Sequence, residues 1–563
     1  MTNDKIKEEK TMRSERQEFT DRGRRRVTLT AGWWGRFGIL RLQLCLILAA
    51  TAIALPAQNE QDPHHPVNFT TLVNFDSTNG GNPAGSLVQG PDGNLYGTTF
   101  GGGANMNCFG TGCGTFFKMS PSGTLTTLYN FCSQANCADG GSPSAALVLG
   151  TDGNFYGITE LGGANGSGTV FAGTVFRITP GGTLTTLYNW CSQPNCADGS
   201  YGLFPESGPP FVQASDGNFY GTTDSGGTFG AGTAFKLTPS GALTTLYTFC
   251  SQSGCADGDL PMGSLIQGSD GNFYGTTYFG GAYGYGTVYK ITSSGTLTTL
   301  YSFCSQGGLG VCTDGALPIV PLIQANDGKF YGSTSFGGAN VNSAYCAAES
   351  GSCGTVFKIT PSGTLTTLYN FCSQANCTDG ASAGFGLVQA TDGNFYGTTL
   401  QGGGNTSCGL PQFGIVGCGT VFEMTPEGKL TTLHSFDSVF QWPLVLFQAT
   451  NGTFYGTTAE GGAYSNCGGN GLACGIAFSL AVGLGPFVKT VPTAGTVAQA
   501  VTILGTDLSD ATHVRFNHAD AEFTVVSDTE IQTSVPAGAT TGVVTVTRHG
   551  PRLKSNVKFQ VLP

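Results

Sequence analysis

The chain has 563 residues, a formal net charge of −11 and only 10% charged side chains. Its 89 glycines would suit a disordered chain, but 11% aromatic residues supply apolar surface that a folded core buries. Residues 58–563 hold 13 Lys or Arg against 29 Asp or Glu, and this acidic balance excludes nucleic acid as a partner because phosphate repels it.

A basic segment followed by an apolar one opens the chain. Arginines at positions 22 to 41 precede an apolar stretch over 42–55, which is shorter than the roughly 20 residues of a membrane-spanning helix. Ala52, Ala54 and Ala57 offer small-residue cleavage sites. We predict an export signal or N-terminal anchor over 1–57, which is a membrane segment if it stays uncleaved. The rest of the chain is then extracytoplasmic: secreted, periplasmic or on the cell surface.

One block, close to LVQ-x-x-DGNFYGTT…GG…GTVFKITPSGTLTTLYNF, recurs seven times between residues 64 and 482. A spacing of 54 to 65 residues suits a small sheet per copy, and such units stack because one copy cannot bury its own apolar faces. The Asp-Gly-Asn element indicates a tight hairpin turn. The tyrosine that follows this turn falls at Tyr96, Tyr156, Tyr220, Tyr274, Tyr331, Tyr396 and Tyr455.

Each copy predicts four strands, and the two ends of the array are complementary. The third and fourth strands of the fifth copy, for example, are expected at 354–360 and 364–369. The seventh copy lacks its fourth strand, whereas a spare strand over 69–72 precedes the first copy. Pairing the two would leave only short, protected sheet edges. We therefore predict an all-β chain with a seven-bladed β-propeller over 64–482, closed by the N-terminal strand.

The predicted propeller has two unlike faces. The turns between strands 1 and 2 and between strands 3 and 4 share one face, which we call the turn face. The loops between strands 2 and 3 and the connections between blades share the other, which we call the loop face. The loop face receives every paired cysteine and most of the length variation. Long variable loops on a rigid scaffold usually hold function, so the loop face is the predicted binding face.

Eighteen cysteines beyond the export segment fall into nine close pairs. An even number in an exported chain predicts disulfides. No CxxC motif and no recurring histidine accompanies them, so we expect no metal site and no cofactor. The predicted pairs are Cys108/Cys113, Cys132/Cys137, Cys191/Cys196, Cys250/Cys255, Cys304/Cys312, Cys346/Cys353, Cys372/Cys377, Cys408/Cys418 and Cys467/Cys474.

Residues that recur in every copy are expected to serve the fold. We expect each repeat tyrosine to pack between blades with its hydroxyl hydrogen-bonded, and each Asp of Asp-Gly-Asn to cap its turn. The Asp-Gly pairs after the second cysteine of each connection are expected to form turns rather than calcium sites, because one carboxylate per blade does not supply six oxygens. These aspartates are Asp139, Asp198, Asp257, Asp314 and Asp379.

Catalysis would need residues that break the repeat. After the repeated Thr-Thr, three copies carry an acid on the predicted loop face: Glu160, Asp224 and Glu460. Glu160 and Asp224 lie in adjacent copies, and a glycosidase needs two carboxylates about 5 to 9.5 Å apart. We expect all three to be solvated loop acids, so they are weak catalytic candidates.

Aromatic side chains on the same loops make a stronger case for binding. Rings among Asn, Gln and Ser with few charges suit stacking on sugars, while packing of the loops on themselves is the alternative. The predicted ligand-binding residues are Phe100, Tyr278, Phe279, Tyr283, Tyr285, Phe336, Trp190 and Trp442, and Tyr345 and Tyr464 occupy the same kind of loop.

After residue 480 the repeat stops, and 486–563 alternates short apolar runs with turns, which predicts an Ig-like β-sandwich. The motifs at 492–495, 501–505, 527–531, 535–539 and 542–546 resemble the IPT/TIG family of Ig-like domains. In exported proteins this resemblance implies a spacer or an adhesive module.

The repeat itself resembles the GloVer-type (Gloeo/Verruco) tandem-repeat family of bacterial surface proteins, which implies export and surface association but no defined activity. We predict an exported or surface protein that binds or adheres without catalysis, with polysaccharide or cell-envelope glycans as partners. Two alternatives stay open: a propeller hydrolase or lyase acting on polysaccharide, and a purely structural envelope protein. Neither the ligand nor the oligomeric state is predicted.

Overall fold

A computed structural model describes most of the chain beyond the predicted export segment. The described residues are 67–108, 110–166, 171–201, 210–306, 312–340, 353–384, 386–405, 409–410, 415–437, 442–465, 467 and 473–562. The export segment predicted over 1–57 lies outside these ranges. Within them, no helix has both the length and the apolar character that crossing a membrane requires.

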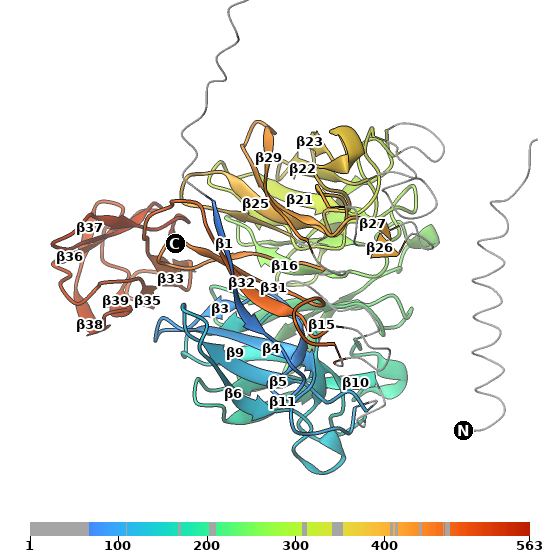
Figure 1. Cartoon of the computed structure of the whole chain (residues 1–563), viewed down its shortest axis with the longest axis horizontal. Coiled ribbons are helices and arrows are strands. Elements are labelled where there is room, and N and C mark those ends of the chain that lie inside the picture. Colours follow the sequence, from blue (N-terminus) through green and yellow to red (C-terminus); the bar gives the residue numbers. More distant parts are fainter. Residues whose placement is uncertain are drawn as a thin grey trace, which may run out of the picture. The chain divides into compact units, whose positions relative to one another are not determined.

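Seven antiparallel sheets, the blades of a β-propeller, follow one another along the chain (Figure 1). Each of the first six repeats supplies an innermost strand, then the strand that carries the repeat tyrosine, then two outer strands. Blade 1 is β2 (Gly81–Pro83), β3 (Val88–Gln89), β4 (Leu95–Gly101), β5 (Thr115–Met119) and β6 (Leu125–Asn130). Blade 2 is β7 (Gly141–Pro143), β8 (Val148–Leu149), β9 (Phe155–Leu161), β10 (Phe171–Ile178) and β11 (Leu184–Asn189).

The next four blades repeat this order. Blade 3 is β12 (Phe211–Gln213), β13 (Phe219–Thr223), β14 (Thr233–Leu237) and β15 (Leu243–Thr248). Blade 4 is β16 (Gly263–Gln267), β17 (Phe273–Thr277), β18 (Thr287–Ile291) and β19 (Leu297–Ser302). Blade 5 is β20 (Ile323–Gln324), β21 (Phe330–Thr334), β22 (Thr355–Ile359) and β23 (Leu365–Asn370). Blade 6 is β24 (Leu387–Gln389), β25 (Phe395–Thr399), β28 (Thr420–Met424) and β29 (Leu430–Ser435), with a small hairpin of β26 (Gly409–Leu410) and β27 (Ile415–Val416).

The seventh blade is built from both ends of the array. Its strands β30 (Phe447–Gln448), β31 (Phe454–Thr458) and β32 (Ile476–Ala481) come from the last repeat, and β1 (Asn68–Asn74) pairs antiparallel with β32. Figure 1 shows β1, in blue, beside the orange β32. The predicted pairing of the spare N-terminal strand is therefore observed. The same blade contacts blade 1, where Thr457 Oγ1 donates to the Gly85 carbonyl at 2.9 Å.

A glutamine at the end of the innermost strand joins successive blades. Its Oε1 accepts a backbone N–H from the turn of the preceding blade, as Gln213 does from Thr151 at 2.8 Å and Gln89 does from Thr450 at 3.0 Å. Blade 1 offers Pro91 at the donor position, which has no N–H. The matching acceptor in blade 2 is Leu149 instead of glutamine. Donor and acceptor are thus absent together, and no buried amide is left unpaired there.

The repeat tyrosines pack between blades as predicted. The Tyr96 ring lies 4.3 Å from the Phe155 ring of the next blade, and its hydroxyl donates to Asp92 Oδ2 at 2.9 Å. Tyr220 and Phe273 repeat the contact at 4.0 Å. Burial, together with the neighbouring Asp92 carboxylate, raises the pKa of Tyr96. Tyr455 differs, since its hydroxyl lies beside Asn451 and not beside a carboxylate. The Asp-Gly-Asn aspartates therefore cap their turns and bind the tyrosines.

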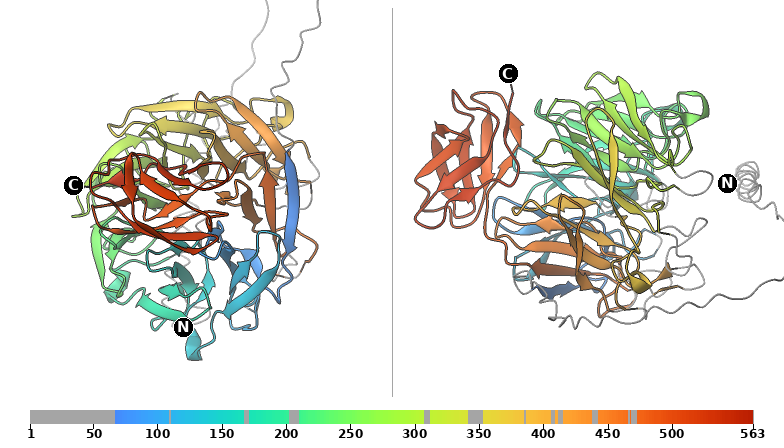
Figure 2. Two further views of the ribbon diagram at one scale, coloured as in Figure 1. Left: turned by 90° about the vertical axis from the view of Figure 1, so that its left-hand side faces the viewer. Right: turned by 90° about the horizontal axis from the view of Figure 1, so that it is seen from above.

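The C-terminal segment forms an Ig-like sandwich. One sheet is β33 (Lys489–Val491), β35 (Ala500–Leu504), β39 (Glu530–Ser534) and β38 (Phe523–Ser527), and the other is β37 (Ala519–Ala521), β36 (His513–Phe516), β40 (Val544–Thr547) and β41 (Leu553–Lys554). Strands β34 (Ala494–Gly495) and β42 (Gln560–Val561) pair in parallel. Figure 2 shows this domain, in red, against the propeller. It contacts the turn face, where Asn326 Nδ2 donates to the Asn556 carbonyl at 3.0 Å.

Candidate binding surface on the loop face

A buried aspartate organises each connection between blades 1 to 6. The Asp139 carboxylate is fully buried and accepts hydrogen bonds from the Tyr129 hydroxyl at 2.7 Å, the Ser133 N–H at 2.8 Å and the Gln134 N–H at 3.0 Å. The same pattern recurs at Asp198, Asp257, Asp314 and Asp379. Both oxygens of these carboxylates are occupied by the fold, which supports the predicted turn-forming role.

The pKa shifts of Asp257 and Tyr129 show how these hydrogen bonds affect protonation. Burial alone raises the pKa of Asp257, but the bonds donated by Ser251, Tyr247 and Gln252 outweigh it and leave the pKa lowered. Burial, together with the Asp139 carboxylate, raises the pKa of Tyr129 to about 12. Asp257 therefore stays ionised and Tyr129 stays a hydrogen-bond donor at neutral pH.

Each connection also holds the loop of the following blade. The carbonyl of its second cysteine accepts a bond from the second glycine of the next Gly-Gly pair, as Cys196 does from Gly227 and Cys255 does from Gly281, both at 2.9 Å. These glycines have positive φ, 76° at Gly227 and 79° at Gly281, a conformation that other residues adopt only with strain. The disulfide loops and the strand 2–3 loops therefore form one bonded layer.

Disulfides join seven of the nine predicted cysteine pairs within the described residues. They lie both in the blade connections and in the strand 2–3 loops, as the sequence predicted. The disulfides are Cys108–Cys113, Cys132–Cys137, Cys191–Cys196, Cys250–Cys255, Cys304–Cys312, Cys372–Cys377 and Cys467–Cys474.

The two other predicted pairs, Cys346/Cys353 and Cys408/Cys418, are described only at their second cysteine. Cys346 and Cys408 lie outside the described residues, so the disulfides Cys346–Cys353 and Cys408–Cys418 stay predictions. Cys353 and Cys418 are each 1% exposed. The Cys418 Sγ lies 3.8 Å from the Asn405 carbonyl oxygen, in the strand 2–3 loop of blade 6. Both cysteines are therefore buried at the loop positions where the sequence placed them.

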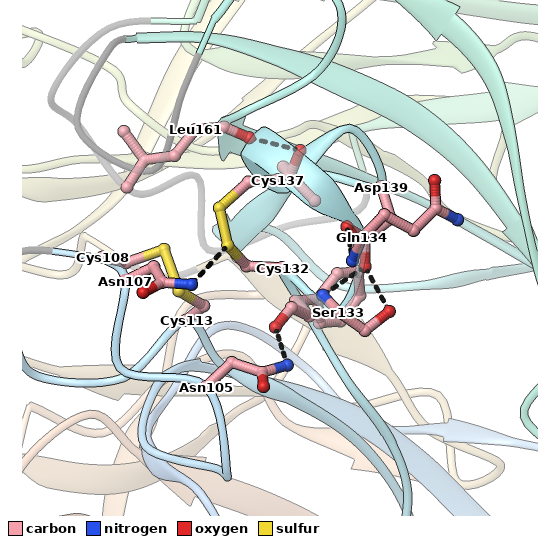
Figure 3. Close-up of a disulfide and its surroundings, with 12 residues drawn as sticks. Asn105, Asn107, Cys108, Cys113, Cys132, Ser133, Gln134, Cys137, Asp139 and Leu161 are labelled. Carbon is pink, nitrogen blue, oxygen red and sulfur yellow. Dashed lines mark hydrogen bonds between the residues drawn. A yellow bond between two sulfur atoms is a disulfide. The ribbon is translucent and has the colours of Figure 1, made fainter.

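Blade 1 places two disulfides side by side (Figure 3). The sulfurs of Cys108, Cys113, Cys132 and Cys137 all lie within 4.8 Å of one another and are buried. Asn107 Nδ2 approaches Cys132 Sγ at 3.8 Å. A strand 2–3 loop and a blade connection therefore meet on one face, as predicted. Four reduced thiols in this arrangement would suit a soft metal ion, but here two disulfides use all four sulfurs.

Exposed aromatic rings gather on the strand 2–3 loop of blade 4. Phe279, Tyr283 and Tyr285 are 39%, 53% and 39% exposed, which is unusual for such large side chains. The loop of blade 3 adds Phe229, 55% exposed. We call these four residues the aromatic platform. Exposed apolar side chains on neighbouring loops are candidates for an interaction site.

Backbone hydrogen bonds fix the loop that carries the platform. Asp259 and Phe279 exchange two N–H to carbonyl bonds at 3.0 Å each. The Gly286 N–H donates to Gly280 at 3.0 Å, and the Leu317 N–H of the next connection donates to Tyr285 at 2.9 Å. The rings are thus presented by an ordered backbone, and little conformational entropy is lost when a ligand binds.

Of the other predicted ligand-binding residues, Trp190 was placed wrongly. It is fully buried and packs against Tyr188, Tyr201 and Phe235, with ring centroids 5.1 to 5.4 Å apart. The sequence placed it in a connection, but the connection folds over it and makes it core. Phe100, Tyr278 and Phe336 are half-buried, whereas Trp442 is 38% exposed in the connection to blade 7. Tyr345 lies outside the described residues.

Sequence reasoning missed Phe229, although a signal for it existed. The loops of blades 3 and 4 read Gly-Gly-Thr-Phe-Gly and Gly-Gly-Ala-Tyr-Gly, so Phe229 is the equivalent of Tyr283. Both loops close with the same turn, Gly230 N–H to Gly227 and Gly284 N–H to Gly281. Neighbouring blades therefore present a ring at the same position.

Two of the three predicted loop acids are buried, and the third, Glu460, is half-buried. Glu160 lies in β9 and is 2% exposed, and Asp224 is 1% exposed. Burial raises the pKa of Glu160 to about 8, against a hydrogen bond from Ser144 and with a smaller contribution from the Asp224 charge. Burial also raises the pKa of Glu460. The expectation of solvated acids was wrong for Glu160 and Asp224, which the fold buries. The predicted proximity of these two residues is supported by their electrostatic interaction.

Family models match most of this architecture. A Gloeobacter/Verrucomicrobia repeat model matches residues 62–172, 172–411 and 342–472, more than half of the chain. The chain is a Gloeobacter/Verrucomicrobia repeat protein. An IPT/TIG domain model matches residues 486–561 of this repeat protein, where the Ig-like sandwich lies. The comparison with curated proteins gave no match.

Solved structures similar to the repeat protein share little sequence with it. A candidate 6-phosphogluconolactonase from Bacteroides uniformis is 15% identical, with a TM-score of 0.35 over 61% of this chain and 84% of that chain. A luciferin-regenerating enzyme is 11% identical, with a TM-score of 0.34 over 75% of this chain and 97% of that chain. Similarity at this level carries no argument about activity.

Proposed function

We propose that this repeat protein is an extracytoplasmic surface protein that binds neutral polysaccharide, without catalysis, through the aromatic platform on its loop face. The exposure of Phe229, Phe279, Tyr283 and Tyr285 on hydrogen-bonded loops carries the proposal. Large amphipathic rings at low entropic cost are what stacking on a sugar face needs. The disulfides and the IPT/TIG domain fit an extracellular protein.

The polarity around the platform favours an uncharged ligand. One acid, Asp259, is hydrogen-bonded through its backbone to Phe279 of the platform. Burial and the Asp257 charge raise the pKa of its carboxyl group, against a hydrogen bond from the Leu260 N–H. Arginine and lysine, which bind acidic sugars through charge-assisted bonds, do not occur between residues 224 and 286 except at Lys236. Lys236 is paired with Asp216 at 3.4 Å on the turn side of blade 3.

The experiment uses the full chain, exported and purified with its disulfides intact. Binding is measured by pull-down on insoluble glucans, xylan and chitin and by affinity electrophoresis in soluble polysaccharides. We expect Phe229→Ala with Tyr283→Ala to weaken binding about tenfold or more. Tyr464→Ala removes a ring of matched exposure, 51%, from blade 7 and should leave binding unchanged. Equal binding by the double variant would refute the platform.

A hydrolase is the second candidate, and one observation favours it. With a pKa of about 8, Glu160 holds a proton at neutral pH, which a general acid requires. Release of reducing ends from the same polysaccharides, lost in Glu160→Gln, would establish this function instead. If neither binding nor release of reducing ends is observed, a structural role in the cell envelope remains.

A further inference from the structure

A pocket lies on the turn face, where the Ig-like domain meets the innermost strands of the propeller. It has a volume of about 320 Å³. Its walls come from five blades, with Val88, Leu149, Ile323, Val388 and Phe447 among the lining residues, and from β33 and residues 555–557 of the Ig-like domain. The volume is at the low end for small-molecule sites, and the walls are mainly apolar.

One cation lines this apolar pocket. Lys489 Nζ lies 3.7 Å from the centroid of the Phe447 ring and 5.5 Å from that of Phe487, and it donates to the Gln448 carbonyl. Lys489 is the single ionisable side chain of the pocket lining. Among the described residues, no carboxylate forms an ion pair with it. Its ammonium therefore has donors to spare and no compensating charge.

We propose that this pocket binds a small organic anion with an apolar body, of the class of a medium-chain monocarboxylate. The carboxylate of the ligand would accept a hydrogen bond from Lys489. Its alkyl chain would contact the valine, leucine and isoleucine side chains of the innermost strands. An ion pair in surroundings of low polarity is stronger than one on the surface. This site lies on the face opposite the aromatic platform and does not depend on polysaccharide binding.

The burial that lowers the pKa of Lys489 to about 7 sets the pH at which the site works. Below that value the ammonium is charged and attracts an anion, and above it the neutral amine does not. A bound carboxylate would in turn favour the charged form. Affinity for an anion should therefore be high near pH 6 and should fall as the pH rises toward 9, by about tenfold or more.

Calorimetric titration of the full exported chain with octanoate at about pH 6 tests the site. We expect saturable binding at one site, with affinity reduced about tenfold or more in Lys489→Met. Lys554→Met removes an exposed lysine that does not line the pocket and is the matched control. Val557→Trp is a second variant, since Val557 is 46% exposed and tolerates a larger side chain that fills the pocket.

Each outcome separates this site from the platform. Tyr283→Ala should leave octanoate binding unchanged, and Lys489→Met should leave polysaccharide binding unchanged. The proposal is overturned by absence of octanoate binding to the folded wild-type chain. Binding that persists unweakened in both Lys489→Met and Val557→Trp would overturn it equally, because octanoate would then sit elsewhere.

Discussion

The loop face and the turn face of this propeller are held together by different means. On the loop face, disulfides, buried aspartates and bonds from Gly-Gly pairs tie each connection to the next blade, and large rings are left exposed. On the turn face, short Asp-Gly-Asn turns are linked by single glutamines and contact an Ig-like domain. The heavily crosslinked face is thus the one free to present a ligand platform.

The difference teaches why the crosslinks lie where they do. A short turn needs no disulfide when its residues already favour the backbone conformation that the turn requires. A long glycine-rich loop loses more entropy on ordering, and a disulfide removes part of that cost. The four predictions below test this contrast, from the largest expected effect to the smallest.

Glycine substitutions should separate the two faces most strongly. In blade 3, a Cβ on Gly232 would lie 2.2 Å from the Thr223 carbonyl oxygen, whereas one on Gly217 meets nothing within 4 Å. Both have positive φ, 91° and 80°. We expect Gly232→Ala to lower the free energy of unfolding by more than about 3 kcal/mol and Gly217→Ala by about 1 kcal/mol. Urea unfolding measures both, and equal losses would contradict the contrast.

Glu160 on the loop face and Lys489 on the turn face should make the free energy of unfolding depend on pH in opposite directions. The pKa of Glu160 rises from 4.5 to about 8 on folding. Its contribution to the free energy of unfolding is therefore present below pH 4.5 and lost as the pH rises through 8. Because the pKa of Lys489 falls from 10.5 to about 7, its contribution is present above 10.5 and lost as the pH falls through 7.

Unfolding measured across pH 5 to 9 should resolve these two slopes. We expect Glu160→Gln to raise the free energy of unfolding by about 3 kcal/mol near pH 8, and Lys489→Met to raise it by about 2 kcal/mol near pH 6. Each variant should lose only its own slope. A wild-type slope retained in either variant would show that the group titrates normally in the folded chain.

Removing one disulfide should cost less and should act locally. Replacing Cys250 and Cys255 by serine should lower the free energy of unfolding by about 2 kcal/mol and should weaken polysaccharide binding, because Gly281 of the platform loop bonds to Cys255. The matched control replaces Cys372 and Cys377, whose connection holds Gly403 of blade 6, a blade without platform residues. That control should cost as much stability but should spare Tyr283 and Tyr285. Comparable loss of binding in both would argue against local anchoring.

The platform rings should matter least to stability. Tyr283 is more than half exposed, so Tyr283→Ala should change the free energy of unfolding by less than about 0.5 kcal/mol while weakening polysaccharide binding. Parallel urea unfolding and pull-down measurements check this. A large stability loss would place the ring in the fold rather than in a binding surface.

Much of the fold could be predicted from the sequence because the same pattern of turns and apolar strands recurs in seven copies. The turn residues, the apolar strands and the spare strand at 69–72 predicted the pairing of β1 with β32, and the aspartates were expected in turns. Exposure did not follow in the same way. Trp190 lies in a blade connection and Phe229 in a glycine-rich strand 2–3 loop, yet Trp190 is fully buried and Phe229 is 55% exposed.

By itself, the sequence determined the blade count, the strand order, the seven disulfides that the structure describes and the identity of the two faces, because these depend on local turn chemistry and on short separations along the chain. The tertiary structure alone decided which loop side chains are buried, that Glu160 and Asp224 are among them, and that Lys489 lines a pocket with residues of five blades. Those outcomes depend on contacts between different blades and domains, which lie tens to hundreds of residues apart along the chain, and no local pattern encodes how closely such segments pack.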